Sequence, residues 1–287
     1  MDNYIKDLKQ RIKNALADLT VSQKRIANAI LENPQKFALS SIRQLENELN
    51  TSKATIVRLT QALGYKGFQE LRSLLLDGLR KDAEPIYRYR YLLENSDQKI
   101  NNHLQSVADE SIENIQRTLM LIDNEQWERT ISLLVNAEHV YTMGLGISAI
   151  LAELASYLFH RVSLKSNHFK SSTLSFVEQI VSLTKNDLIF AISLPSYSKE
   201  TILAAEYALE KGIKVVALTD SLTNDIIKYS SAFLKVITDT KTISNSISSI
   251  QVILYALCSQ IAFEQKEDTL RTIDSIAHVR EEHSGLR

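Results

Sequence analysis

The sequence predicts two domains, an all-helical domain followed by an α/β domain whose parallel sheet carries helices on both faces. The 287 residues exceed what one hydrophobic core usually serves. Apolar residues recur at helical spacing up to about residue 80, whereas from about residue 139 short apolar runs alternate with helical patterns. With 44% apolar and 23% charged residues, the composition is that of an ordinary globular protein.

The expected helical domain covers residues 1–80 and contains four amphipathic stripes. Within each stripe, apolar residues stand three or four positions apart, which places them on one helical face. The stripes are Ile26, Ile30 and Leu31; Ile42, Leu45 and Leu49; Ile56, Leu59 and Leu63; and Leu71, Leu74 and Leu75. Ser41 and Gln44 have the spacing of a capping box, which marks the start of a helix.

A linker and an α/β domain are expected after this region. Residues 81–99 are charged, contain Pro85 and interrupt the apolar period, so they predict a linker to a domain over 100–287 with its core at about 120–265. Two helical patterns open that domain, at 100–119 and around Trp127. Four apolar strands follow at 139–143, 187–192, 214–218 and 232–237, each before a helical pattern, at 147–160, 199–211, 223–230 and 244–263. This alternation is typical of a parallel sheet covered on both faces.

Two short helices with a tight turn between them predict a helix-turn-helix unit. Residues 41–49 and 52–63 are separated by two residues only. In the second helix, Ala54, Arg58 and Gln61 lie opposite the apolar stripe, so they would face DNA. The first turn and the residues that follow the helix supply the other candidate contacts, which are Ser52, Lys53, Thr55 and Lys66. An ordinary helical hairpin with a solvated polar face is the alternative interpretation.

The charge distribution favours a polyanionic partner for the helical domain. Residues 1–80 carry a net charge of +5, whereas residues 81–287 carry −6. A basic segment joined to an acidic one suggests that the first part binds a polyanion such as double-stranded DNA, although a charge of this size also arises by chance.

A glycine turn after the first predicted strand is a candidate anion site. Gly144 and Gly146 follow that strand, and Ser148 lies at the start of the next helix. Glycines let backbone amides approach an anion, and a helix N-terminus favours negative charge. The turn is not a dinucleotide fingerprint, because position 149 is alanine where a third glycine would stand. A plain strand-to-helix turn is the alternative.

A serine-rich loop after the second predicted strand offers four hydroxyl groups. They belong to Ser193, Ser196, Ser198 and Thr201. Hydroxyls and backbone amides can bind a phosphate without a lysine. Ser198 and Thr201 could simply cap the following helix, but four hydroxyls exceed that need. Because ligands of open α/β sheets bind at the carboxyl ends of strands, both turns are expected at one ligand site.

Two parts of the sequence resemble a known bacterial family. The stretches LTVSQKRIANAILENP (19–34) and LSSIRQLENELNTSKATIVRLTQALGYKGFQEL (39–71) resemble the N-terminal domain of RpiR/MurR-type transcriptional regulators. Residues from about 120 to 265 resemble the SIS (sugar-isomerase) domain of the same family, on the two turns above, Glu200 and the run Leu218-Thr-Asp-Ser221. The usual serine loop reads Ser-x-Ser-Gly-x-Thr, and here Pro195 and Ser196 depart from it.

The resemblance implies a transcriptional regulator of sugar catabolism, amino sugars among the candidates. Its reading helix would begin at Ser52, and a sugar phosphate bound in the SIS domain would control its operator affinity. The rival hypothesis is a phosphosugar isomerase with a helical appendage. Such an enzyme needs a general base, for which His160, His168 and Glu178 are candidates, none of them within a recognisable motif. His168 is also a candidate ligand contact. We therefore expect a sensor and not an enzyme.

The remaining expectations concern partners, cofactors and location. Six scattered histidines and one cysteine show no metal-ligand spacing, so neither a metal nor a cofactor is expected. The start of the chain is no secretory signal, and the longest apolar runs are too short to cross a bilayer, so we expect no membrane partner and a cytoplasmic protein. A single helix-turn-helix makes few contacts, so we expect a homodimer or a dimer of dimers, with helices 100–119 and 244–263 as candidate interfaces.

Overall fold

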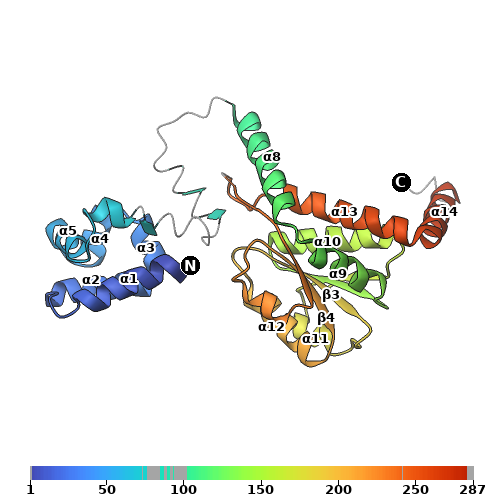
Figure 1. Ribbon diagram of the computed structural model, residues 1–287, viewed down its shortest axis with the longest axis horizontal. Coiled ribbons are helices and arrows are strands. Elements are labelled where there is room, and N and C mark those ends of the chain that lie inside the picture. Colours follow the sequence, from blue (N-terminus) through green and yellow to red (C-terminus); the bar gives the residue numbers. More distant parts are fainter. Residues whose placement is uncertain are drawn as a thin grey trace. The chain divides into compact units, whose positions relative to one another are not determined.

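The computed structural model describes residues 2–72, 74–75, 85–86, 89–90, 93, 102–240 and 242–282. The chain forms two compact units, Met1–Asp97 and Gln98–Arg287 (Figure 1). All but five residues of the predicted linker, 81–99, lie outside the described residues.

The first unit is helical, as predicted. Its helices are α1 (Asp2–Ala15), α2 (Val21–Glu32), α3 (Pro34–Leu39), α4 (Ile42–Glu48) and α5 (Lys53–Ala62). Most residues of the four predicted stripes are buried in one core, but Leu74 is exposed and does not belong to its stripe. Helices α1 and α3 were not predicted, and α1 contributes Leu8 and Ile12 to the same core.

Side-chain caps fix where the helices of this unit begin. The predicted capping box is confirmed, because the Ser41 hydroxyl accepts from the Gln44 amide at 3.2 Å and the Gln44 side chain accepts from the Ser41 amide at 2.7 Å. A second capping box, formed by Thr20 and Gln23, starts α2 at Val21. Asn33 caps α3, whose first residue is Pro34, where a missing amide hydrogen costs nothing.

The second unit contains the predicted parallel sheet. Two helices, α8 (His103–Leu121) and α9 (Asn124–Val135), precede five strands, β1 (Val140–Met143), β2 (Ser166–His168), β3 (Leu188–Ser193), β4 (Lys214–Thr219) and β5 (Ala232–Lys235). The strand order is β2-β1-β3-β4-β5, and every pairing is parallel. The four predicted strands are confirmed, whereas the short edge strand β2 was missed.

Helices cover both faces of the sheet (Figure 1). On one face, α9, α10 (Ile147–Arg161) and α13 (Ser248–Glu264) pack against alternate strand residues such as Phe190 and Val216. On the other face, α11 (Phe176–Ile180) and α12 (Lys199–Glu210) pack against the intervening residues, such as Ile189 and Val215. Alternation between the two cores along single strands explains why these strands are apolar throughout.

Three segments differ from their predicted form. The pattern at 223–230 forms a 3₁₀ helix, η1 (Asp225–Tyr229), not an α-helix. Helix α13 begins at Ser248, four residues after the predicted start at residue 244. A further helix, α14 (Lys266–Glu282), follows α13 and was not predicted. None of the helices in the described part of the chain is both long and apolar enough to cross a membrane.

Candidate DNA-binding and ligand sites

Helices α4 and α5 form a helix-turn-helix unit whose second helix presents a polar face. Ile56 and Leu59 of α5 are buried in the core of the unit. Most of the predicted DNA contacts are exposed, namely Ser52, Lys53, Ala54, Arg58, Gln61 and Lys66, whereas Thr55 is half-buried. The Ser52 hydroxyl caps α5 by accepting from the Thr55 amide at 3.2 Å, and the two hydroxyls lie 2.9 Å apart.

Two charged side chains, Arg25 and Glu46, form hydrogen bonds with backbone groups on either side of the turn between these helices. Arg25, on α2, donates to the carbonyl oxygens of Leu49 and Asn50 at 2.6 and 3.1 Å, at the negative end of the α4 dipole. At the positive end of α5, the Glu46 carboxylate accepts a short hydrogen bond from the Lys53 amide. Part of the N-terminus of α5, expected to be available for a DNA phosphate, is therefore occupied by a side chain of the protein.

The glycine turn after β1 needs a glycine at its first position. A Cβ atom on Gly144 would lie 2.6 Å from the carbonyl oxygen of Ser148, closer than any real Cβ contact. Gly146 has a φ of 61°, which favours glycine, and it precedes α10 without a side-chain cap. Ser148 is buried in the first turn of α10. This turn therefore holds its backbone close to the start of a helix that has no side-chain cap of its own.

The two predicted ligand turns leave the sheet at the same edge and toward opposite faces. Met143, the last residue of β1, pairs with Ala191 of β3, two residues before Ser193. From there α10 lies over one face and α12 over the other. Adjacent parallel strands whose connections diverge in this way form the switch point at which α/β sheets bind ligands.

The hydroxyl groups of the serine loop have different surroundings. Ser193 is buried, and its hydroxyl accepts from Asn224 at 2.9 Å, which also donates to the Thr219 hydroxyl on the neighbouring strand. Ser198 caps α12 by accepting from the Thr201 amide at 3.4 Å. The Thr201 hydroxyl is buried and has no hydrogen-bond partner within the described residues. Ser196 is exposed.

Glu200 and His168 make contacts beside these turns. The Glu200 carboxylate accepts from the Phe176 amide at 3.0 Å, so it caps the first turn of α11. His168, on β2, has its Nδ1 atom 3.2 Å from the carbonyl oxygen of Thr142 on β1. Partial burial lowers the pKa of His168, against smaller raising effects of the Thr142 hydrogen bond and Glu153. A neutral ring that donates from Nδ1 keeps Nε2 free to accept a hydrogen bond.

Sequence reasoning missed the residues that support the two sites. Asn224 caps η1 and joins β3 to β4, and Asn245 donates from its side chain to the Pro195 carbonyl oxygen at 2.8 Å. Tyr197, in the serine loop, donates from its hydroxyl to Asp220 at 3.0 Å. Tyr197 and Asp220 stood in stretches that the sequence had singled out, whereas Asn224 and Asn245 did not. No group of three or more His, Cys, Asp or Glu side chains that could hold a metal ion occurs in the part of the chain that the structure describes.

Comparison with known proteins agrees with this two-part organisation. The family model of the helix-turn-helix domain of the RpiR family matches residues 6–82, and that of the SIS domain matches residues 133–282. The HTH-type transcriptional regulator YbbH of Bacillus subtilis is 32% identical over 202 residues, which are 70% of this chain and 69% of the relative. A regulator of Haemophilus influenzae is 28% identical over 92% of this chain and 95% of its own length.

Solved structures share the fold. The sugar isomerase domain of an RpiR transcription factor from Sphaerobacter thermophilus has a TM-score of 0.59 and 23% identity, covering 62% of this chain and 99% of its own. The Vibrio vulnificus NanR protein, solved in complex with ManNAc-6P, also has a TM-score of 0.59, with 22% identity over 96% of this chain and 99% of its own.

The helix-turn-helix unit and the SIS domain together define a transcriptional regulator with an SIS domain. The chain belongs to the RpiR family, as its sequence motifs had indicated.

Proposed function

We propose that this protein binds operator DNA through α5 and that a sugar phosphate bound at the carboxyl edge of its sheet controls the operator affinity. The observation that carries the proposal is the Thr201 hydroxyl. It is buried in the first turn of α12, beside the Ser198 cap, and no described residue bonds it. A buried polar group without a partner is costly, and a phosphate oxygen would satisfy it.

Several other features of the same edge suit an anion. The starts of α10 and α12 diverge from neighbouring strands, and α10 has no side-chain cap. Helix N-termini and hydroxyl donors bind phosphates without a cationic side chain. Ser148, Ser193, Ser196, Ser198 and Thr201 are the proposed donors, with the Gly144 and Gly146 amides, and His168 and Glu200 are proposed neighbours of the sugar. Since the NanR structure contains ManNAc-6P, a phosphorylated amino sugar is the first ligand to test.

The residues that could serve as the general base of an isomerase fit a sensor better than an enzyme. Glu178 is exposed and bonded to Ser175 in the capping box of α11, and these hydrogen bonds lower its pKa, so it is a poor proton acceptor. His160 lies in the last turn of α10, at the opposite edge of the sheet from the two turns. Only His168 remains near the proposed ligand, and a sensor needs no acid–base pair. Purified protein should therefore bind sugar phosphates without converting them.

The proposal includes the cytoplasm as location and a second copy of the chain as partner. A regulator must meet DNA and a metabolite in one compartment. Since one reading helix contacts few bases, we propose a homodimer or a dimer of dimers that reads an inverted repeat.

The decisive experiment compares two buried threonines whose hydroxyls both lack a partner within the described residues. Thr201→Val removes the hydroxyl at the proposed site, and Thr130→Val does the same on α9. Operator binding is titrated with and without ManNAc-6P. We expect Thr201→Val to need about 10- to 150-fold more ligand for the same effect, which corresponds to a hydrogen bond to a charged group.

Operator affinity without ligand should be the same in both variants, because α5 belongs to the other unit. Thr130→Val should respond to ligand as the parent does. If Thr201→Val also responds at the parent's ligand concentrations, the serine loop only caps α12. A panel of other sugar phosphates distinguishes a wrong site from a wrong sugar, because a wrong sugar leaves the parent itself unresponsive.

A further inference from the structure

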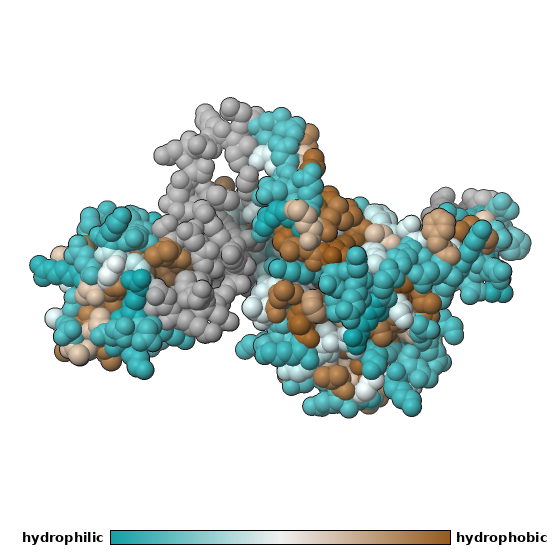
Figure 2. All heavy atoms as spheres, in the orientation of Figure 1, coloured by the Kyte–Doolittle hydropathy of each residue, from teal (hydrophilic) through white to brown (hydrophobic). Residues whose placement is uncertain are grey.

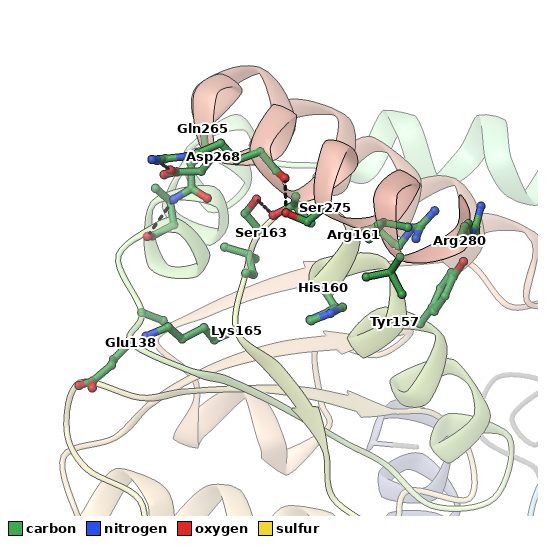
Figure 3. Close-up of a pocket in the computed structure, with 17 residues that line it drawn as sticks. Glu138, Tyr157, His160, Arg161, Ser163, Lys165, Gln265, Asp268, Ser275 and Arg280 are labelled. Carbon is green, nitrogen blue, oxygen red and sulfur yellow. Dashed lines mark hydrogen bonds and ion pairs between the residues drawn. The ribbon is translucent and has the colours of Figure 1, made fainter. Parts of the chain in front are cut away.

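A groove of about 950 Å³ lies at the amino ends of the strands, opposite to the carboxyl ends from which the two ligand turns leave (Figure 3). Its lining includes Ala137 and Glu138, which precede β1, and Lys165, which precedes β2. The end of α10 forms one wall and α14 forms another. Because all strands are parallel, the residues before the strands and the residues after them lie at opposite edges. This volume is in the range that small-molecule sites occupy, roughly 300–1,000 Å³.

The groove is positively charged although the unit that contains it is acidic. Residues 100–287 carry a net charge of −6, yet the groove is lined by Arg161, Lys165, Arg271 and Arg280 against two acidic residues. One of those acids is Asp268, which pairs with Arg271 along α14. No ion pair to Arg161, Lys165 or Arg280 occurs within the described residues. Three cations, against the one remaining acid Glu138, are therefore left to attract an anion.

The two walls of the groove are tied to each other. The hydroxyls of Ser163 and Thr272 lie 2.8 Å apart, joining the segment after α10 to α14. At the start of α14, Gln265 donates to the Val135 carbonyl oxygen at 3.4 Å. The first contact holds α14 beside the end of α10, and the second holds the start of α14 beside the end of α9.

Arginines from both walls gather at one end of the groove. Figure 3 shows Arg161 of α10 and Arg280 of α14 at the end where Tyr157 lies. The Arg161 guanidinium lies 5.8 Å from the centre of the Tyr157 ring, a cation–π contact that restrains it without neutralising it. Guanidinium groups are planar and offer paired donors, which suits phosphate and carboxylate groups.

We infer that this groove binds a small molecule with two or more negative charges on phosphate or carboxylate groups, held by Arg161 and Arg280. Lys165, farther along the groove, would contact a second charged group. The site is separate from the one proposed for the sugar phosphate, because it lies at the other edge of the sheet. It would give the regulator a second ligand, sensed by a different helix.

The test is isothermal titration calorimetry of the full-length protein with pyrophosphate and, in a second arm, with citrate. We expect saturable binding of at least one probe, and the tighter probe identifies phosphate or carboxylate as the preferred group. Arg280→Gln and Arg161→Gln should each weaken that binding about tenfold or more, as expected for loss of a charge-assisted hydrogen bond. Arg129→Gln is the matched control, since Arg129 is exposed on α9 and does not line the groove.

Three results would overturn the inference. The first is that neither probe saturates the parent protein, as happens if a second copy of the chain covers the groove. The second is that Arg129→Gln weakens binding as much as the two groove variants, which indicates an effect of net charge. The third is that Thr201→Val removes the binding while Arg161→Gln and Arg280→Gln do not, which places the probe at the other edge. Failure of the sugar-phosphate proposal leaves the first two comparisons unchanged.

Discussion

Arg58 is the residue on which operator recognition is expected to depend most. It is exposed on the polar face of α5, opposite the buried Ile56 and Leu59. Arg58→Ala should weaken operator binding by about 1–3 kcal/mol if the side chain makes a bidentate base contact. Lys66→Ala should weaken binding evenly across DNA sequences and flatten its salt dependence. Fluorescence anisotropy at several salt concentrations measures both. An Arg58→Ala protein that binds operator as tightly as the parent would show that another face of α5 meets DNA.

Gly144 is expected to tolerate no side chain. The Cβ of Gly144→Ala would overlap the backbone of Ser148 in the first turn of α10, so the helix must shift. We expect a loss of about 1–3 kcal/mol in the free energy of unfolding, measured by urea denaturation. Gly67→Ala is the control, because a Cβ there meets nothing within 4 Å. Equal stability of the Gly144→Ala protein and its parent would contradict the close approach.

His168 should make stability depend on pH. Its pKa in the folded protein lies below the ordinary value of 6.5, chiefly because burial disfavours the charged ring. The unfolded chain therefore binds the proton more readily. The stability contribution is present above about pH 6.5 and is lost as the pH falls through the lower pKa of the folded state. His168→Gln should flatten the dependence of unfolding free energy on pH between about 7 and 5. An unchanged slope would mean that the ring is freely solvated.

For single residues, the sequence predicted well which side chains are exposed, but it did not predict which residues they bond. The helical period alone placed Arg58 and Gln61 on the exposed face of α5, because periodicity reports which side of a helix is buried. It could not reveal that Arg25 contacts Leu49, 24 residues away, or that Asn224 contacts Ser193, 31 residues away. Such hydrogen bonds depend on the packing of whole elements and leave no local pattern.

A helix or strand could be predicted from the sequence when it is strongly apolar, and it was missed when it is not. Four strands were found because each is a continuous apolar run, which burial on both faces requires. Strand β2 has only three residues, Ser166, Asn167 and His168, and lies at an edge of the sheet, so it lacks that signal. Helix α14 was missed although Leu270, Ile273 and Ala277 stand at helical spacing, because its sequence is mostly polar and most of its residues are exposed.

The hydrogen bonds of Arg25 to the turn of the helix-turn-helix unit should matter for DNA binding. Arg25→Gln removes the charge that holds the carbonyl end of α4, so α5 should lose its fixed angle to α4. We expect about a tenfold loss of operator affinity, because the loss of one charge-assisted hydrogen bond is of this size. Lys24→Gln removes the same charge from the neighbouring residue and is the control for electrostatic attraction alone. If both variants bind DNA equally, Arg25 acts only through its charge.

Self-association is a property of the whole molecule. Helix α8 exposes Leu104, Ile112 and Met120, and Figure 2 shows hydrophobic surface over the end of α8 and the neighbouring α13. We expect the protein to sediment as a dimer or tetramer at micromolar concentration and Ile112→Glu to shift it toward monomer. Leu203→Glu, on the exposed side of α12, is the control. A parent protein that sediments as a monomer, with or without DNA, would contradict this proposal.

The divergence of α10 and α12 has a consequence for how the second unit fluctuates. Each helix belongs to a different hydrophobic core, and the two cores are separated by the sheet. Without ligand, each helical layer can open locally at its own rate, so hydrogen exchange at the first turn of α10 and at that of α12 would be independent. An anion that accepts hydrogen bonds from both turns would tie the layers into one cooperative unit, and their amides would exchange together. A ligand could then change the ordering entropy of the domain, and with it the affinity of a second partner, without moving any helix far.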